Sequence, residues 1–509
     1  MASNIKGLVF DLGGVLLEWD RHSATGSLSS RQFLTIMNTT TWHNLDRGTL
    51  DLKSACKEFA ELLEVSPDTV ETALEQAQLS LSVNASLVRT IHDLRKSNPR
   101  LKFYVMSNIS REHFEMVQKL DIPWSVFTLV FASGVEGMRK PDLCFFQHVI
   151  QKTGFSAEEL LMIDDTPENI CAARSLGMHG LLVDKKVASS SVLRNLLQDP
   201  LPRAEQFMKI NAGNHHSIVE GHGDLVLKDN FVQLLIWELT GDADMVYLRY
   251  PSGELLGAQI HANGKPNGAV LDHLKVKNGL WNYFYETPVL TTTEFPPDAD
   301  TTSIAYLSLP EEYLDKVADV KIVLDAMAEN LDSEGIMQTY FCNQRPRTTP
   351  EVCCNILRVF HRFGYASDPR IAKTEEWVVK CLKNKACLTG NRHYSTPEGF
   401  LYFVARLYVD SSEKLKSKLR GIHDELLERI DVPTNPLALA LRISACQLVK
   451  IDPQRYRRDL ELLMSLQDED GGWPAGHFCC TGRTRDRIGN RGFTTALAMK
   501  IIRDEKSMV

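Results

Sequence analysis

Two patterns of apolar and polar positions divide the chain. Within residues 1–185 there are four short apolar runs, each ended by polar residues: Gly7–Phe10, Phe103–Met106, Thr128–Ala132 and Leu160–Ile163. Short runs of this kind are typical of parallel strands that are buried on both faces. The pattern predicts an α/β domain with a parallel sheet at residues 1–190.

A helical pattern covers residues 221–509. Several apolar segments begin with a Thr, Ser or Asn beside Pro or Thr, near Thr301, Thr349, Thr396, Asn435 and Thr494. Such residues are helix-start signals. Their spacing of roughly 40 to 60 residues, with more polar helices between them, predicts stacked helix pairs. An all-α domain built as an α/α barrel fits this pattern, although the periodicity alone would favour an α-solenoid binding scaffold. Residues 191–220, polar and glycine-containing, are assigned to a linker.

Composition and charge narrow the class of partner. The chain has 509 residues, of which 43% are hydrophobic and 24% charged, and its formal net charge is −8. Negative charge disfavours nucleic acid and anionic membranes, and no apolar run is long enough to span a membrane. We therefore expect no nucleic-acid partner and no stable membrane insertion. The 11 cysteines show no zinc-binding spacing and no apolar leader is present, so a reduced, cytoplasmic protein is expected.

Residues suited to phosphoryl transfer follow the predicted strands. They are Asp11, Ser107 with Asn108, Lys140, and Asp164 with Asp165. The carboxyl ends of parallel strands form the edge of the sheet where ligands bind. A carboxylate nucleophile, a hydroxyl group, a lysine and metal-binding carboxylates are the groups that this chemistry needs.

These motifs, in this order, resemble those of the haloacid dehalogenase superfamily, whose Rossmann-like fold carries a helical cap. The resemblance implies that Asp11 is the nucleophile. It assigns the phosphoryl group to Ser107, Asn108 and Lys140. It also implies a Mg²⁺ site made by Asp11, Gly13, Asp164 and Asp165, with Asp165 as the best ligand. The helix-patterned stretch at about 20–90 falls where that family inserts its cap.

Gly13 departs from the pattern of the family. Its phosphatases usually carry a second Asp at this position as general acid, and loss of a general acid costs about 10²- to 10⁴-fold in rate. The cost depends on the leaving group, because phosphate leaves a diphosphate without a proton whereas an alkoxide needs one. A working phosphatase, a slow or partial one, and a degenerate scaffold all remain open.

A second set of motifs lies in the helical part. The stretch Asp298-Ala-Asp300-Thr301-Thr302 precedes an apolar helix, and Gln467-Asp-Glu-Asp470-Gly-Gly-Trp473 follows far along the chain. An Asp-x-Asp pair by itself is typical of a turn, a helix start or a metal site. Together, however, the two motifs resemble the acid motif and the Gln–Trp repeats of class II terpene cyclases. The Thr-Thr ending behind a haloacid dehalogenase-like domain is similar to drimane-type sesquiterpene synthases, which act on farnesyl diphosphate.

The resemblance implies a role for each residue of these motifs. Asp300 is the expected acid that protonates a carbon–carbon double bond, and Asp298 tunes its acidity. The substrate contacts are expected from Thr301, Arg485 and Trp473. Other arginines considered for the diphosphate are Arg345, Arg347, Arg392, Arg483, Arg487 and Arg491. Aromatic side chains, including Tyr283, Tyr340 and Tyr394, are candidates to line the cavity for the carbocation.

Three hypotheses follow. In the first, the helical domain cyclises farnesyl diphosphate and the amino-terminal domain hydrolyses the bicyclic diphosphate to an alcohol of the albicanol or drimenol type. In the second, the amino-terminal domain is inert and the diphosphate is released. In the third, a phosphatase carries a helical protein-binding scaffold.

Overall fold

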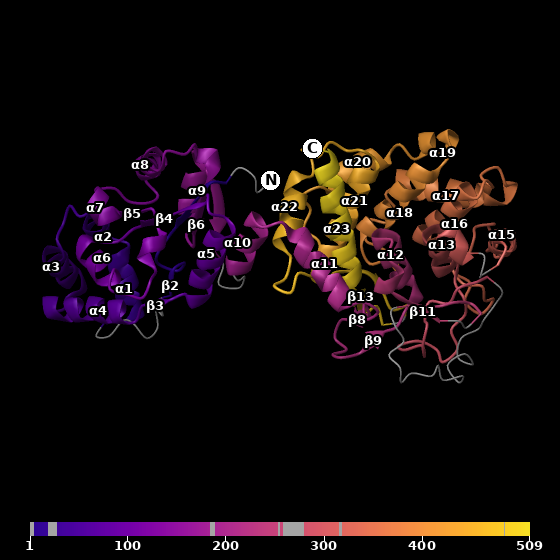
Figure 1. Ribbon diagram of the computed structural model, residues 1–509, viewed down its shortest axis with the longest axis horizontal. Coiled ribbons are helices and arrows are strands. Elements are labelled where there is room, and N and C mark those ends of the chain that lie inside the picture. Colours follow the sequence, from indigo (N-terminus) through magenta and orange to yellow (C-terminus); the bar gives the residue numbers. More distant parts are fainter. Residues whose placement is uncertain are drawn as a thin grey trace. The chain divides into compact units, whose positions relative to one another are not determined.

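The computed structural model describes residues 5–18, 28–183, 189–252, 255–257, 279–314, 318–482 and 484–508. The chain divides into two units, Met1–Gln198 and Asp199–Val509, which are described separately (Figure 1). Within these described ranges, no helix combines the length and the apolar character that crossing a membrane requires.

A parallel sheet forms the centre of the first unit. Its strand order is β5-β4-β1-β6-β7. The strands are β1 (Gly7–Phe10), β4 (Lys102–Ser107), β5 (Leu129–Ala132), β6 (Leu160–Asp164) and β7 (His179–Leu182). Phe10 pairs with Val105 on one side and Ile163 on the other, so the carboxyl ends of the three middle strands lie together. The predicted α/β, Rossmann-like sheet is confirmed.

Helices bury both faces of this sheet. Alternate strand residues enter two separate apolar clusters, because successive side chains of a strand point to opposite faces. Phe10 and Val105 join the cluster that contains α5 (Ala85–Ser97), whereas Val9 and Tyr104 join the cluster of α8 and α9. Besides α5, the helices around the sheet are α6 (Arg111–Val117), α7 (Ser133–Glu136), α8 (Leu143–Thr153), α9 (Pro167–Ser175) and α10 (Ser189–Leu197).

Four helices with their own apolar cluster occupy the stretch in which a cap is expected. They are α1 (Ser30–Met37), α2 (Thr40–Asp46), α3 (Leu52–Leu63) and α4 (Pro67–Leu79). The strands β2 (Leu17–Glu18) and β3 (Ser82–Val83) pair antiparallel at the two ends of this insertion. The insertion thus leaves and rejoins the sheet domain through one short ribbon.

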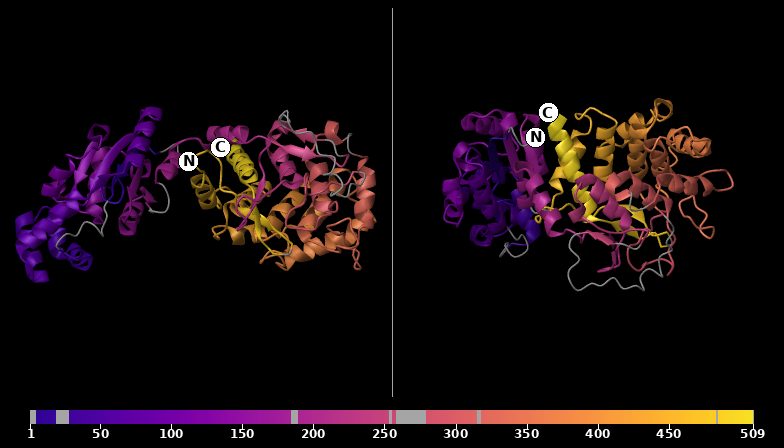
Figure 2. Two further views of the ribbon diagram at one scale, coloured as in Figure 1. Left: turned by 90° about the horizontal axis from the view of Figure 1, so that it is seen from below. Right: turned by 45° about the vertical axis from the view of Figure 1, so that its right-hand side comes forward.

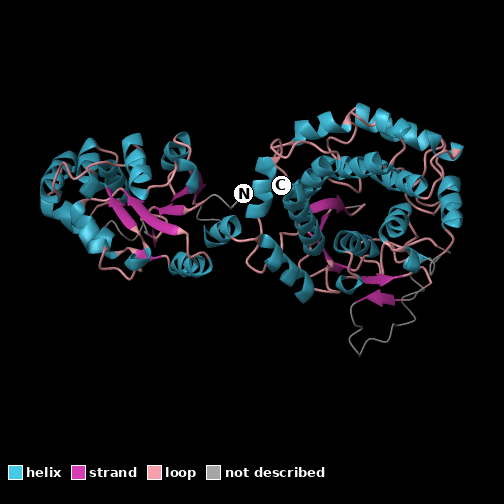
Figure 3. Ribbon diagram, turned by 45° about the horizontal axis from the view of Figure 1, so that its top comes forward, coloured by secondary structure: helices cyan, strands magenta, loops and turns pink. Residues whose placement is uncertain are grey.

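Six inner helices of the second unit pack side by side in a closed ring. They follow the order α12 (Asn230–Thr240), α13 (Ala299–Ser308), α16 (Pro350–Arg362), α18 (Pro397–Asp410), α21 (Pro436–Leu448) and α23 (Arg491–Met508), and α23 packs on α12. Further helices lie outside this ring, as Figure 3 shows. The outer helices include α15 (Val320–Glu329), α17 (Ala372–Lys383), α19 (Glu413–Lys418), α20 (Ile422–Arg429) and α22 (Arg457–Ser465). This arrangement is the predicted α/α barrel.

The segment assigned to a linker is structured. Residues 191–220 contain most of α10, which packs on α5, and all of α11 (Pro200–Ile210), which packs along α23 (Figures 1 and 2). The boundary falls at Gln198 and Asp199, so these residues belong to the two units. Burial of Leu193, Ala204 and Phe207 stabilises these helices, and the polar residues beside them concealed that pattern.

A small antiparallel sheet makes the second unit other than purely all-α. Its order is β12 (His477–Cys480), β13 (Arg487–Gly489), β8 (Ser217–Val219) and β9 (Val226–Leu227). A second ribbon pairs β10 (Tyr247–Arg249) with β11 (Leu255–Gly257). Strands of two to four residues are too short to show a clear alternating pattern, which is why the sequence did not indicate them.

Candidate active sites

The first site lies at the carboxyl end of the parallel sheet. Asp11 directly follows β1, and its amide donates to the Ile163 carbonyl at 2.9 Å. The Lys140 ammonium lies 2.9 Å from Asp11 Oδ1 and 2.5 Å from Asp164 Oδ2. All three charged side chains are buried. The structure therefore brings the predicted nucleophile, lysine and carboxylate together.

Negative charge is in excess at this site. Ligand oxygens of Asp11, Asp164 and Asp165 lie within 4.8 Å of one another. Burial, together with the charges of Asp164 and Asp165, raises the pKa of Asp11 to about 7, although Lys140 opposes the shift. Clustered carboxylate oxygens facing one lysine suit a hard divalent cation such as Mg²⁺, which would offset the repulsion.

Hydrogen bonds distinguish the two neighbouring carboxylates of β6 and its loop. Asp164 Oδ2 accepts from Lys140, and Oδ1 accepts from the Thr166 amide and from Asn169 Nδ2, each at 2.9 Å. Asp165 Oδ1 accepts from the Thr166 hydroxyl at 3.3 Å. Both oxygens of Asp164 are thus engaged by donors, and Asp164 holds Lys140 beside Asp11.

The two glycines after the nucleophile differ in what surrounds them. Gly14 has a φ of +74°, and a Cβ built on it would lie 2.1 Å from Asp165 Oδ2. A side chain at Gly14 is therefore excluded. A Cβ on Gly13 would meet no atom within 4 Å. Lack of space is therefore not the reason why this position carries glycine instead of an acidic residue.

Ser107 and Asn108 occupy the end of β4. Ser107 is buried at the sheet edge. The Asn108 side chain is engaged with the backbone of Lys140: Nδ2 donates to its carbonyl at 2.8 Å, and Oδ1 accepts from its amide at 2.7 Å. Asn108 therefore positions the lysine loop, a role that the sequence did not indicate.

The second site is built on the first turn of α13. Asp298 is the N-cap of the helix, and its Oδ1 accepts from the Thr301 amide at 2.7 Å. The Thr302 hydroxyl donates to the Asp298 carbonyl at 2.6 Å and accepts from the Trp281 amide at 2.9 Å. Asp300, two residues after Asp298, lies in the same turn. The Thr-Thr ending therefore holds the carboxylate pair in place through backbone contacts.

Two other inner-ring segments reach the Asp300 carboxyl group. Asn355 Nδ2 of α16 donates to Oδ1 at 2.9 Å, and the Tyr394 hydroxyl donates to Oδ2 in a short hydrogen bond. The side chains of Asp298, Asp300, Asn355 and Tyr394 are all buried. Among the described residues, Asp300 thus has no ion pair and is supported by two neutral donors.

Burial gives the acidic residues of this site unusual affinities for protons. It raises the pKa of Asp298 to about 8, with a further contribution from the Asp300 charge. Burial also raises the pKa of Asp300, but the bonds from Tyr394 and Asn355 limit it to about 6. Glu351, one helical turn before Asn355, has its pKa raised by burial to about 8. At neutral pH the carboxyl groups of Asp298 and Glu351 therefore stay largely protonated, whereas Asp300 is protonated in only a fraction of the molecules.

Aromatic rings cluster in the residues around this acid. Tyr283 packs near Phe295, and Phe295 packs edge-on against Tyr340 at 5.8 Å between ring centroids. Tyr394 lies 5.6 Å from Phe478. Such rings present π faces that stabilise a cation without attacking it. Tyr283, Tyr340 and Tyr394 were among the side chains that the sequence indicated.

The other residues predicted to contact the substrate lie in different environments. Trp473 is fully buried between helices, and its indole N–H donates to the Leu463 carbonyl at 2.7 Å, so its described contacts are structural. Arg491 forms ion pairs with Asp468 and Asp470 beside it. Arg485 lines a polar pocket at the amino termini of α18 and α21. Arg483 lies outside the described residues.

Sequence reasoning missed the groups that support Asp300. Tyr394 was considered only as an aromatic wall, and Asn355 and Glu351 were not considered. Glu351 and Asn355 lie four residues apart on α16, a spacing that places both on one helix face. That spacing was the available signal, but nothing in the sequence indicates that this face meets α13.

Comparisons with known proteins cover both units. The family described as haloacid dehalogenase-like hydrolase matches residues 5–177, and the sesquiterpene cyclase astC-like C-terminal domain matches residues 201–363. The chain is 33% identical over 501 residues to the drimenol cyclase drtB of Aspergillus calidoustus, covering 98% of this chain and 88% of the relative.

Two further likenesses concern the first unit alone. The sesquiterpene phosphatase astK of Aspergillus oryzae is 30% identical over 197 residues, which are 39% of this chain and 99% of the relative. A haloacid dehalogenase family enzyme of Bacteroides thetaiotaomicron, solved with magnesium and inorganic phosphate, is 22% identical with a TM-score of 0.32, covering 37% of this chain and all of that one. The match along nearly the whole chain, together with the two family models, has one consequence: the chain belongs to the family of drimane-type sesquiterpene cyclases in which a haloacid dehalogenase-like domain precedes the cyclase domain.

Proposed function

We propose that this enzyme cyclises farnesyl diphosphate to a bicyclic drimane diphosphate and then hydrolyses it to drimenol. The observation that carries the proposal is the buried carboxyl pair Asp298 and Asp300, which has no ion pair within the described part of the chain. The chain belongs to a family that includes a drimenol cyclase, and this supports the choice of a ring alkene as product. The match of the first unit to a sesquiterpene phosphatase supports the second step.

Asp300 is the proton donor in this proposal. Protonating an isolated alkene needs a strong acid, and a carboxyl group is strengthened when its conjugate base is stabilised away from water. Tyr394 and Asn355 donate to the carboxylate that remains after the proton has left. Asp298, with the higher pKa, stays protonated at neutral pH and adds no negative charge that would hold the proton back.

Exclusion of water is the second requirement. The cation formed at the distal double bond must be attacked by the next double bond rather than by a hydroxyl ion or water. The buried rings of Phe295, Tyr340 and Phe478 supply π density and no basic lone pair. Two ring closures follow, and a base then accepts a proton from the carbon next to the cation, which leaves a bicyclic alkene with its diphosphate intact.

Asp11 is the nucleophile of the hydrolytic step. Lys140 neutralises charge beside it, and Asp164 holds Lys140 in position. We assign the Mg²⁺ site to Asp11, Asp165 and the backbone at Gly13, and a bound ion would neutralise charge on the phosphoryl oxygens. Because Gly13 supplies no general acid, cleavage between the phosphorus atoms is the favoured first reaction, with phosphate as leaving group. Hydrolysis of the resulting monoester is the slower one.

One incubation tests the whole proposal. The purified chain is given farnesyl diphosphate and Mg²⁺, and products are extracted with and without later treatment by an unrelated phosphatase. Free drimenol without that treatment is the expected result. Bicyclic alcohol found only after treatment would limit the function to cyclisation, and no bicyclic product in either sample would contradict the proposal. Asp244→Asn, in an exposed Asp-x-Asp outside the site, is the matched control for Asp300→Asn.

A further inference from the structure

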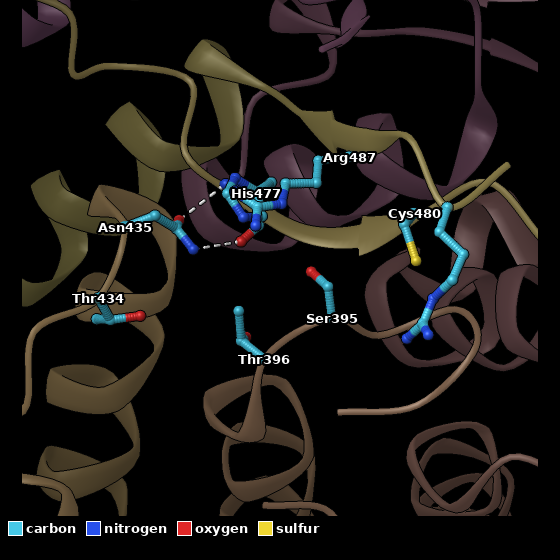
Figure 4. A pocket seen from close by; sticks show the side chains of 8 residues that line it. Ser395, Thr396, Thr434, Asn435, His477, Cys480 and Arg487 are labelled. Atoms are coloured by element: carbon cyan, nitrogen blue, oxygen red, sulfur yellow. Dashed lines mark hydrogen bonds between the residues drawn. The ribbon is translucent and has the colours of Figure 1, made fainter. Parts of the chain in front are cut away.

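A polar pocket lies where α18 and α21 begin. Its volume is about 430 Å³, within the range of ligand sites. Its lining includes Ser395, Thr396, Asn435, His477, Arg485 and Arg487. Figure 4 shows Ser395 and Thr396 facing His477 and Arg487 across the space. None of the described lining residues is acidic, so the pocket carries positive charge.

Backbone contacts build this pocket from three segments. Asn435, the N-cap of α21, bonds to the backbone of His477 in both directions, at 2.7 and 2.8 Å. A Cβ on Gly476 would lie 2.2 Å from the Leu437 nitrogen, so only glycine allows β12 to approach α21 this closely. The pocket wall is therefore held by bonds between β12 and α21.

Its donors are incompletely satisfied. Thr396 is the N-cap of α18 and only 8% exposed, yet the helix has no side-chain cap. The hydroxyl groups of Ser395 and Thr396 have no hydrogen-bond partner among the described residues. Arg485 contacts the Asn391 carbonyl at 3.5 Å and also interacts with the Cys480 thiol, and Arg487 lies 3.6 Å from Glu220. Helix amino termini and guanidinium groups both favour phosphate oxygens.

We propose that this pocket binds a phosphate or diphosphate group. One chain segment links the pocket to the acid, because Tyr394, which contacts Asp300, immediately precedes the pocket residue Ser395. Tyr394 pairs with Cys479 in a β-bridge, and neighbouring side chains of an extended segment point to opposite sides. The anion is either the head group of the isoprenyl diphosphate or free inorganic diphosphate, and only the first source rests on the proposed function.

Titration with inorganic diphosphate tests the pocket itself. The full chain, without added metal, is compared with the variant Arg485→Gln/Arg487→Gln and with Thr396→Val, which keeps shape and removes one hydroxyl group. Arg420→Gln, an exposed arginine on the outer ring, is the matched control. We expect affinity at least about tenfold weaker in the double variant, because two charge-assisted contacts are lost. Unchanged affinity in both pocket variants would overturn the proposal.

Cyclisation kinetics identify the source of the anion. If the substrate head group binds here, the double variant raises KM for farnesyl diphosphate and largely keeps kcat. If free diphosphate binds here, KM stays constant while the titration weakens. A wild-type chain that did not cyclise farnesyl diphosphate would contradict the proposed function, and the titration would still decide whether the pocket binds diphosphate.

Discussion

Replacing Tyr394 by Phe removes one hydrogen-bond donor from Asp300 and leaves the ring in place. A hydrogen bond to a charged acceptor contributes about 1 kcal/mol more than one to a neutral acceptor. The hydroxyl group therefore favours the carboxylate over the acid by about that amount. Its loss should raise the pKa of Asp300 by about one unit from its value of about 6.

The same change slows proton transfer, because the carboxylate left in the transition state is less stabilised. Since about 1.4 kcal/mol corresponds to a factor of ten, the reduction is at most about tenfold. The two effects differ in their dependence on pH. Below the pKa both enzymes are protonated, so the variant should be slower by up to about tenfold at pH 5. Near pH 8 its larger protonated fraction compensates, so the two rates should converge.

The assay measures the initial rate of bicyclic product at saturating farnesyl diphosphate from pH 5 to pH 8.5. Samples are quenched and then treated with an added phosphatase, so that hydrolysis by the chain does not affect the count. Wild-type cyclisation should decline as pH rises above about 6, because Asp300 acts in its protonated form. Tyr306→Phe, a buried tyrosine of α13 that bonds to the Ala318 carbonyl, is the control. A variant slower by the same factor at every pH would refute the reasoning.

Three further predictions concern the two sites. Asp300→Asn should abolish cyclisation and leave phosphate release from supplied bicyclic diphosphate intact, whereas Asp11→Asn should do the reverse; loss of both activities in either variant would indicate misfolding instead. Gly13→Asp, which the open space at this residue allows, should speed release of phosphate from the bicyclic monophosphate by about 10²- to 10⁴-fold, and an unchanged rate would show that no general acid acts from this position. Trp473→Phe should destabilise the helical unit in urea unfolding by about 1–3 kcal/mol, because the Leu463 carbonyl loses its donor, while KM for farnesyl diphosphate stays constant; a raised KM would restore Trp473 as a substrate contact.

The parallel sheet and the inner ring were predictable because both depend on local pattern. A short apolar run that ends at Asp11 implies a buried strand with a carboxylate at its end, whatever surrounds it. Thr349-Pro350 and Asn435-Pro436 start helices for reasons contained within one turn. The helices within 191–220 were missed because the segment is mostly polar. Burial of a few apolar residues such as Ala204 and Phe207 is enough to stabilise them. That burial depends on α23, about 290 residues later.

The sequence by itself determined which reactive groups the chain carries and where each lies on its own strand or helix. It indicated Asp300 as the acid and Asp11 as the nucleophile, since both follow from motifs of a few residues. Only the tertiary structure decided the pKa values of those groups. Tyr394 lies 94 residues from Asp300 and Asn355 lies 55 residues from it, and both meet it only because the inner ring closes. Burial and hydrogen bonding set a pKa, and neither is a property of a residue's neighbours along the chain.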